Sequence, residues 1–405
     1  MSAAARSAYA ARPMSSESDP GVAGARVARA GRRAARATWG AAVLLGALLG
    51  LGRSSWFVEQ VWARTLSPCL GIALGRASGL LPFSLADWVL VGLPVVLLVL
   101  VVRGSRQIVR ERAWRPAVRS GATRLLRWSL AGALLFYATF GLGYGARPLA
   151  ERLGWPAATP AGDRNTQADE LAALCRAAVE ATNVNYRAAL GVDDLGEPSQ
   201  WPGTRAELER VLDEGLAAAG TELGLDPWFA VSRGPSKRPL LSPLMRKLGI
   251  SGFYFPWTGE ANVNARTPGC DLVRVTAHEK AHQRGIARED EAEFLGFLAG
   301  ARAPHPYARY VAHRFAANLL LIELQKIDPA RCRELYDELL PGARRDHETS
   351  REYYAREQHT RLTDIAITIN HSYIRVHGDV RGVHAYGAAA ELLIRYARLR
   401  GGRLP

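Results

Sequence analysis

Cysteine is scarce in this sequence. The chain has four cysteines, Cys69, Cys175, Cys270 and Cys332, and no two of them form a Cys-x-x-Cys pair. This spacing excludes a zinc site built from thiolates and a scaffold held together by many disulfides. A single disulfide among Cys175, Cys270 and Cys332 remains open.

Charged residues are also few. They make up 22% of a chain of 405 residues, whereas 48% of the residues are apolar. This length allows two or three domains. Because the composition is rich in apolar residues for a wholly soluble protein, we expect a membrane portion.

The positive charge is confined to two stretches, and most of the chain lacks it. Residues 1–36 carry seven arginines against two acids, and residues 103–127 carry eight arginines against one acid, which gives 5 + 7 = 12 of the 14 net charges. The rest of the chain is close to neutral and offers no basic face to a phosphate backbone. Nucleic acid is therefore not an expected partner.

Three apolar runs flank these basic stretches and predict membrane spans at about 37–53, 86–102 and 128–145. The first run has fifteen uncharged residues, 38–52, which fall a little short of a hydrocarbon core. A cleaved signal peptide is the alternative for this run, but its basic leader is too long and no Ala-x-Ala-like site comes after it. Residues 54–83 have an apolar face with few charges and predict an interfacial helix.

The arginines between the second and third runs predict the orientation, because Lys and Arg concentrate in loops that stay in the cytoplasm. Residues 1–36 then form a basic cytoplasmic tail, and the third span carries the C-terminal part of the chain across the membrane. The expected organisation is a transmembrane region over 37–145, a linker over 146–165 and an extracytoplasmic domain over 166–405. We therefore expect a multi-pass protein of the cell membrane, with the lipid bilayer as one partner.

The extracytoplasmic region has mostly helical patterns. Thr166 is placed to cap one helix, and Thr204 with Glu207 forms a capping-box pattern at the start of another. Residues 250–255, ISGFYF, are the best strand candidate of the domain. Apolar spacing predicts further helices over 307–327, 330–340, 345–376 (with or without a break) and 383–399. The predicted fold class is mainly α, with about three N-terminal transmembrane helices and a small β element.

Residues 278–282 read His-Glu-Lys-Ala-His, which is an HExxH pattern. On a helix, His278 and His282 lie one turn apart on the same face, so both imidazoles can bind one Zn²⁺, with Glu279 beside its water. Zinc activates the water and Glu279 acts as general base, which is the arrangement of a zincin metallopeptidase. Because the bare pattern also arises by chance, its helical context and a third ligand decide its meaning.

A turn and three acids come after the motif. Gly285 is placed to end the helix in a left-handed conformation, and a second helix is expected to start near Ala287. That helix returns Glu289, Glu291 and Glu293 towards the histidines. We expect Glu289 as third ligand, Glu291 as the alternative ligand, and Glu293 as a carboxylate that orients an imidazole N–H. The other interpretation is a solvated acidic first turn, which suits the helix dipole.

Two further features are candidates for a part in peptide hydrolysis. Residues 249–264 precede the motif helix and can either pair with an extended peptide or pack as an ordinary strand. In the C-terminal part, Tyr386 is the first candidate to stabilise an oxyanion, ahead of Tyr373, His377 and His384. A Tyr or His on a helix is more often simply packed or exposed.

Three blocks, over 239–264, 276–299 and 370–393, resemble in that order the characteristic blocks of a bacterial family of uncharacterised membrane proteins. That family is described as a domain of unknown function with a zincin-like motif. The resemblance runs from the first apolar segment to nearly the C-terminus. It implies a membrane-anchored zinc peptidase with an α-rich zincin-like domain.

The resemblance also assigns roles to single residues. His278, His282 and Glu289 match the ligand positions of the family motif, and Glu279 matches the base. The sequence departs from the motif at two positions: Lys280 is a charge inside it, and Glu293 stands where asparagine is expected.

The expected function is a membrane-anchored, zinc-dependent metallopeptidase that hydrolyses peptide bonds, with a peptide or protein of the cell envelope as substrate and Zn²⁺ as cofactor. A catalytically inactive zincin-fold scaffold or binding protein of the envelope is the alternative. A transporter is disfavoured because the three short spans carry neither buried charges nor a paired repeat.

Overall fold

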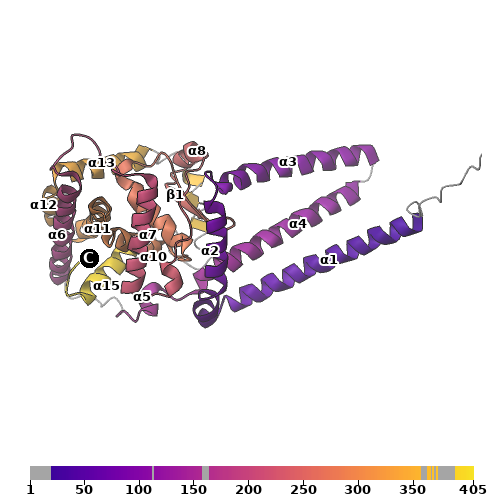
Figure 1. Cartoon of the computed structure of the whole chain (residues 1–405), viewed down its shortest axis with the longest axis horizontal. Helices are drawn as coiled ribbons and strands as arrows, with labels where there is room; N and C mark the ends of the chain where they lie inside the picture. The colour runs from indigo at the N-terminus through magenta and orange to yellow at the C-terminus, as the bar shows by residue number, and fades with distance from the viewer. Residues whose placement is uncertain are drawn as a thin grey trace, which may run out of the picture.

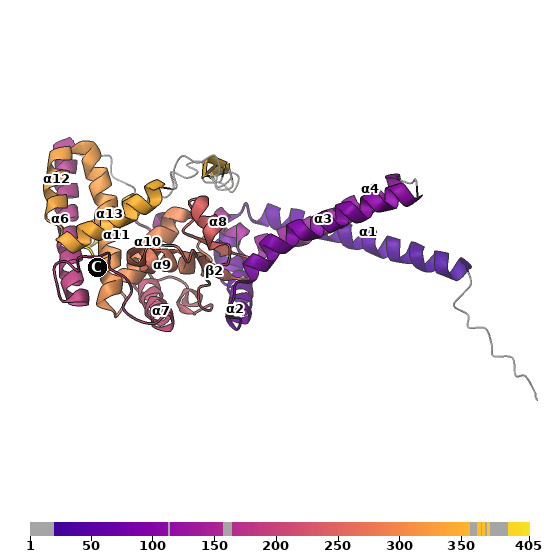
Figure 2. The same ribbon diagram turned by 90° about the horizontal axis from the view of Figure 1, so that it is seen from above.

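The computed structural model describes residues 20–111, 114–156, 164–356, 363–365, 367–368, 371–372 and 388–405. The protein is mainly helical, as predicted, and has a small two-stranded sheet. Figures 1 and 2 show a globular domain at one end, from which three long helices extend to the same side. These helices are α1 (Pro20–Leu51), α3 (Leu85–Glu111) and α4 (Trp114–Thr139).

Two of the long helices contain a segment that is long and apolar enough to cross a membrane. The segments are Gly31–Leu51 in α1 and Leu85–Arg106 in α3. None of the most apolar stretch in α1 and only 11% of that in α3 is buried inside the protein. Neither segment therefore packs as an internal core helix.

The third expected span, 128–145, is not one continuous helix. α4 ends at Thr139, and a mostly buried 3-10 helix, η2 (Gly141–Gly145), comes after it. Because arginines continue along α4 to Arg127, its uncharged part, 128–139, is about 18 Å long at 1.5 Å per residue, against about 30 Å for a hydrocarbon core. The end of this apolar run packs against the globular domain instead.

Helix α2 (Leu66–Gly79) lies where the long helices meet the domain (Figure 1) and is the helix expected between the first two runs. Trp62 Nε1 donates a hydrogen bond to the Ala138 carbonyl at 2.7 Å, and Ser67 Oγ donates to the Thr139 carbonyl at 3.0 Å. These bonds satisfy carbonyls in the last turn of α4, which a helix end otherwise leaves without partners. They join α4 firmly to the region around α2.

The globular domain is built mainly from helices that pack around one apolar core. Its longer helices are α6 (Arg164–Leu190), α7 (Arg205–Glu222), α9 (Leu272–Gln283), α10 (Glu289–Ala301), α11 (Pro306–Ile327), α12 (Pro329–Asp337), α13 (Pro341–Arg356) and α15 (Ala389–Leu399). The shorter helical segments are η1 (Phe57–Trp62), α5 (Leu149–Arg152), η3 (Pro227–Ala230), α8 (Ser242–Lys247) and η4 (Gly269–Asp271). The core includes leucines with no exposed surface: Leu212, Leu216, Leu295, Leu298 and Leu320.

The local helix signals were largely correct. The capping box of Thr204 and Glu207 is present at the start of α7. α6 begins at Arg164, so Thr166 lies inside the helix and is not its N-cap, because the two residues before it continue the helical backbone. The four cysteines are free thiols, so the disulfide that the sequence left open is absent.

The predicted strand is present as β1 (Gly252–Phe255), which pairs in antiparallel fashion with β2 (Glu260–Val263). Gly252 is opposite Val263 in this register. On its other side, β2 makes a parallel bridge through Asn262 to Lys237. β1 is therefore the edge of the small sheet, and both strands pack against α9.

Candidate metal centre

The HExxH residues lie on α9, and the chain reverses directly after it. Gly285 has φ 91°, a left-handed conformation that suits glycine, and its N–H donates to the His282 carbonyl at 2.9 Å. α10 begins four residues later, at Glu289. The turn predicted from Gly285 is thus present, and it brings the first turn of α10 beside the histidines.

Two imidazoles and one carboxylate converge between α9 and α10. His278 Nε2 and His282 Nε2 are 3.1 Å apart. Glu289 Oε2 lies 3.2 Å from His282 Nε2 and 3.3 Å from His278 Nε2. One ligand atom from each of the three residues therefore faces a common point, and all three side chains are largely buried.

These separations fit a zinc ion. Two ligands at about 2.0–2.1 Å from a tetrahedral zinc lie about 3.3 Å apart. His282 Nδ1 is 2.7 Å from the Ile286 carbonyl, so it carries the proton in the neutral ring and leaves the lone pair on Nε2. The donor set of two imidazoles and one carboxylate is common among catalytic zinc sites, which keep a fourth position open.

The acids after the motif have different partners in the structure. Glu289 is the one that lies with the two imidazoles. The alternative ligand, Glu291, faces away and accepts hydrogen bonds from Leu149 N at 2.7 Å and Arg152 Nη2 at 2.9 Å. Glu291 thereby holds α5 against α10, because its side chain lies on another side of that helix.

Glu293 lies behind His278, on the side away from Glu289. Its Oε1 is 3.7 Å from His278 Nδ1, which is longer than a hydrogen bond, and 3.0 Å from Arg274 Nη1. Arg274 also donates to the Tyr354 hydroxyl at 3.2 Å. Glu293 is thus adjacent to the imidazole that it was expected to orient, but its closest partner is a buried arginine that sequence reasoning did not identify.

The carboxylate of Glu279 is buried beside β1, with only 3% of the residue exposed. A Cβ added to Gly252 would lie 2.5 Å from Glu279 Oε1, so glycine is needed for this close approach. Glu279 Oε2 has no hydrogen-bond partner within the described part of the chain. Burial, the largest influence, raises the pKa of Glu279 to about 7, although both imidazoles oppose the shift.

The charges of the centre depend on one another. Burial by itself lowers the pKa of His282, but the adjacent Glu289 carboxylate outweighs it and raises the value to about 9. Burial likewise favours a higher pKa for Glu289, and the two imidazoles hold it well below the usual range. The Glu289 carboxylate is therefore ionised and supplies negative charge to the cluster.

Lys280, the charged residue inside the motif, points to the opposite side of α9. Two residues correspond to about 200° of helix, so it cannot face the metal centre together with His278 or His282. Its side chain is fully buried, and Nζ lies 2.6 Å from Glu209 Oε2 and 3.0 Å from Asp213 Oδ1. Lys280 is therefore a paired core residue that fastens α9 to α7.

Arg284 completes this ionic cluster, defined here as Lys280, Arg284, Glu209 and Asp213. Arg284 Nη2 lies 2.6 Å from Asp213 Oδ1, and its Nε donates to the Phe229 carbonyl at 2.9 Å. Burial opposes ionisation of Asp213, but Lys280 and Arg284 outweigh it and lower the pKa of this carboxyl. Every charge in the ionic cluster has a close counter-charge.

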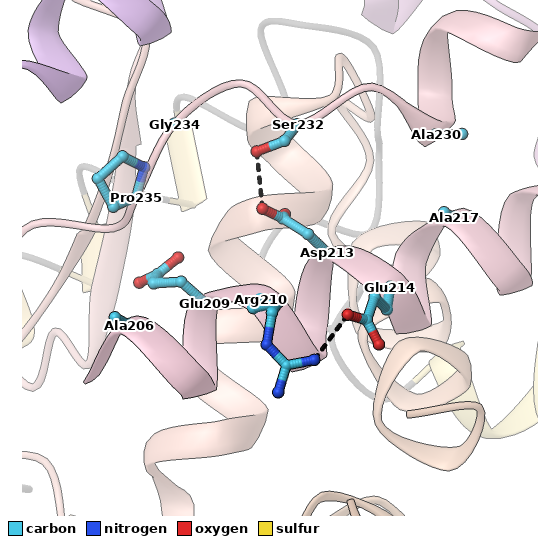
Figure 3. A pocket seen from close by; sticks show the side chains of 10 residues that line it. All are labelled: Ala206, Glu209, Arg210, Asp213, Glu214, Ala217, Ala230, Ser232, Gly234 and Pro235. Carbon is cyan, nitrogen blue, oxygen red and sulfur yellow. Dashed lines mark hydrogen bonds and ion pairs between the residues drawn. The ribbon is translucent and has the colours of Figure 1, made fainter. Parts of the chain in front are cut away.

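A pocket of about 590 Å³ lies beside the ionic cluster, between α7 and residues 230–235 (Figure 3). Glu209 and Asp213 are among its lining residues, and Asp213 also accepts a hydrogen bond from Ser232 Oγ at 2.7 Å. None of the three converging metal-ligand candidates lines this pocket. Its acids are engaged by buried cations, so it is separate from the metal centre in both place and chemistry.

Sequence reasoning did not identify Phe140 or Gly252 as neighbours of the centre. The Phe140 ring, just after α4, meets the His282 ring edge-on at 6.0 Å and the Tyr254 ring at 5.1 Å. No sequence signal joins Phe140 to a histidine so distant in the chain. Gly252 did carry a signal, since a glycine inside a predicted strand often marks a close approach. Tyr386 and the other C-terminal candidates, Tyr373, His377 and His384, lie outside the described residues.

Comparison with known proteins gives one match. A family model described as "Protein of unknown function (DUF3810)" matches residues 62–394, a stretch that includes α2, α3, α4 and the whole of the candidate metal centre. No curated protein matches the chain, and no solved structure does. Because the match covers most of the sequence, the chain belongs to this family of proteins of unknown function.

Proposed function

We propose that this protein is a membrane-anchored zinc metallopeptidase of the zincin type. The observation that carries the proposal is the convergence of His278 Nε2, His282 Nε2 and Glu289 Oε2 within 4.8 Å of one another. The unpartnered, buried oxygen of Glu279 on the same helix supports it. Buried polar groups are normally paired, so a group left without a partner beside three converging ligands is typical of a functional site.

In this proposal His278, His282 and Glu289 hold the zinc ion. When bound, zinc lowers the pKa of water and polarises a peptide carbonyl. Glu279 takes a proton from the attacking water as the new C–O bond forms, and it delivers that proton to the amine nitrogen as the C–N bond breaks. Glu293, which Arg274 holds in place, lies near His278 Nδ1 and limits the orientations open to that imidazole.

The free edge of β1 is suited to hold an extended peptide. Asn264 N donates to the Ser251 carbonyl at 2.8 Å, so in an antiparallel ladder the alternate residues Gly252 and Tyr254 direct their backbone groups away from β2. That edge passes directly beside Glu279. A peptide paired with it would run past the proposed base.

For the location, we propose a multi-pass protein of the cell membrane with the globular domain outside the cytoplasm. The exposed apolar helices α1 and α3 and the arginines between α3 and α4 support this orientation. It also requires α4 to cross back, and α4 returns from the arginines to the domain in contact with α1 and α3, which shield its shorter apolar part. An envelope polypeptide is then the proposed substrate.

Metal analysis and peptide hydrolysis on the purified full-length chain in detergent test the proposal. We expect bound zinc in the wild type, none in His278→Ala, and zinc without hydrolysis in Glu279→Gln. Glu338→Gln, a change of an exposed acid whose partner is Arg176 of α6, is the matched control for both readouts. Wild-type protein that binds zinc but hydrolyses nothing in a mixed peptide library would favour an inactive scaffold, and wild type without zinc would contradict the metal site itself.

A further inference from the structure

Exposed apolar side chains gather where α3 leaves the globular domain. Leu80, at the end of α2, is 86% exposed, and Leu240, in the segment before α8, is 80% exposed. Phe83 and Trp88 are also exposed, and their rings meet edge-on at 6.3 Å. We call these four residues the collar. Single exposed apolar residues are ordinary, but a group drawn from separate segments indicates a binding surface.

Hydrogen bonds fix the collar to the first turn of α3. Asp87, in that turn, is 6% exposed and accepts from Leu240 N at 2.6 Å and from Leu241 N at 3.2 Å. Glu260, at the start of β2, accepts from Leu85 N and Ala86 N, each at 2.9 Å. Both acids, Asp87 of α3 and Glu260 of β2, are therefore hydrogen-bonded to backbone N–H groups and buried, so they do not interrupt the apolar surface of the collar.

A second contact extends this surface to α4. Trp257, in the β1–β2 turn, is 37% exposed, and its Nε1 donates to the Gly132 carbonyl at 2.9 Å. Its ring stacks on Phe136 at 5.7 Å. A tryptophan with an apolar body and a hydrogen-bonded N–H is typical of the boundary between water and lipid.

We propose that the collar is immersed in the interfacial layer of a lipid bilayer, at the depth where α3 enters it. The exposed apolar side chains of α3, among them Val91, Val95 and Leu98, continue directly from the collar. A partner protein would have to enclose α3 to cover the same side chains, whereas lipid surrounds a spanning helix on all sides. Basic residues at the end of α8, Arg246 and Lys247, suit anionic headgroups.

The collar also brings the metal centre close to the lipid, because β1 joins the two regions. The β1 strand runs from Gly252, beside Glu279, to Phe255, two residues before Trp257. Three steps at 3.3 Å place the centre about 10 Å along the strand from the turn. If the proposed peptidase function holds, its substrates are segments close to a membrane surface. The lipid contact itself does not depend on that function.

Site-directed fluorescence tests the collar on the full-length chain, reconstituted in vesicles of equal parts phosphatidylcholine and phosphatidylglycerol. A Cys69→Ser background removes the exposed native thiol, and the other three cysteines are buried. An environment-sensitive label is then attached to Leu240→Cys or Leu80→Cys. Val184→Cys, exposed on α6 at the opposite end of the domain, is the control, and Leu98→Cys on α3 is the reference for the bilayer core (Figures 1 and 2).

We expect blue-shifted emission from the two collar labels and several-fold stronger quenching by shallow nitroxide lipids than at Val184. The Leu98 label should be quenched best by deep nitroxides. Collar labels that behave like the Val184 label, while Leu98 is quenched, would overturn the collar but leave the span in place. Blue-shifted collar labels that lipid nitroxides fail to quench would mean that protein, here a second copy of the chain, covers the collar, and would also overturn the proposal. If the Leu98 label is not quenched, both proposals, that α3 spans the bilayer and that the collar contacts lipid, would be contradicted.

Discussion

The two faces of α9 are equally buried but differ in how their polar groups are satisfied. On one face, Lys280 and Arg284 each lie within 3.0 Å of a carboxylate of α7. On the other, the Nε2 atoms of His278 and His282 face each other and Glu289, and an oxygen of Glu279 has no hydrogen-bond partner in the described residues. A face whose charges are all paired holds the fold together, whereas three ligand atoms that converge beside a buried oxygen with no hydrogen-bond partner among the described residues are typical of a binding site.

A third buried histidine sharpens the comparison. His313 on α11 packs edge-on against Phe297 at 6.1 Å, and its Nδ1 has no hydrogen-bond partner among the described residues. Burial and the nearby charges of Arg309 and Arg302 lower its pKa to about 4. His313 is a neutral core residue, because no carboxylate of the described residues approaches it as Glu289 approaches His282.

The largest expected effect comes from breaking the satisfied face. Lys280→Met leaves Glu209 buried without a counter-charge, while Asp213 keeps only Arg284. Removing one partner of a buried ion pair lowers the free energy of unfolding by about 3–5 kcal/mol. Denaturant unfolding of the full chain in detergent measures the loss. Adding Glu209→Gln to Lys280→Met should restore part of the stability. A neutral effect of Lys280→Met alone would mean that the ion pairs do not fasten α9 to α7.

A smaller effect separates the two acids of α10. Glu289→Gln should weaken zinc binding by more than the roughly 10–100-fold that an outer-shell change costs. Glu291→Gln is its matched control, because that side chain binds Leu149 and Arg152 instead. Competition with a fluorescent zinc chelator measures both affinities. The opposite order of effects would assign the third ligand to Glu291.

Next in size is a change that disturbs only the base. Gly252→Ala places a methyl group against Glu279, whose side-chain atoms would lie 2.5–2.9 Å from it. Hydrolysis should fall about tenfold or more, as a displaced base predicts, while the zinc content stays unchanged. Ser251→Ala, one position earlier in the chain, is the control in the same peptide assay. Equal activity of both variants would show that Glu279 tolerates the added carbon.

The last prediction concerns His313 and the pH dependence of stability and leaves the metal centre untouched. The unfolded chain takes up this proton near the ordinary pKa of 6.5, whereas the folded protein resists it down to about 4. The unfolded state therefore binds more protons in this window, and the free energy of unfolding falls as the pH drops through it. His313→Leu should flatten this dependence between about pH 6.5 and pH 4. Equal pH slopes for wild type and variant would contradict a buried neutral imidazole.

Sequence reasoning succeeded where the signal was local. The capping box at Thr204, the strand containing Gly252 and the turn at Gly285 each depend on neighbouring residues and backbone conformation. The proximity of Glu289 to the histidines followed from the same turn, since its length sets where α10 begins.

Sequence reasoning failed where distant parts of the chain meet. The sequence showed Lys280 only as a departure from the motif. Its role depends on Glu209 and Asp213 of α7, which are distant in the chain. The expected third span, 128–145, contains a helix end at Thr139, after which the buried 3-10 helix η2 packs against the domain. Neither contact has a trace in local periodicity.

The most direct test of the metal centre is X-ray absorption at the zinc edge on the full-length chain. We expect two imidazole nitrogens and oxygen ligands at about 2.0–2.2 Å, with one imidazole contribution lost in His282→Ala. A zinc-free wild-type protein under zinc-replete conditions, or a spectrum unchanged by His282→Ala, would contradict the proposed site.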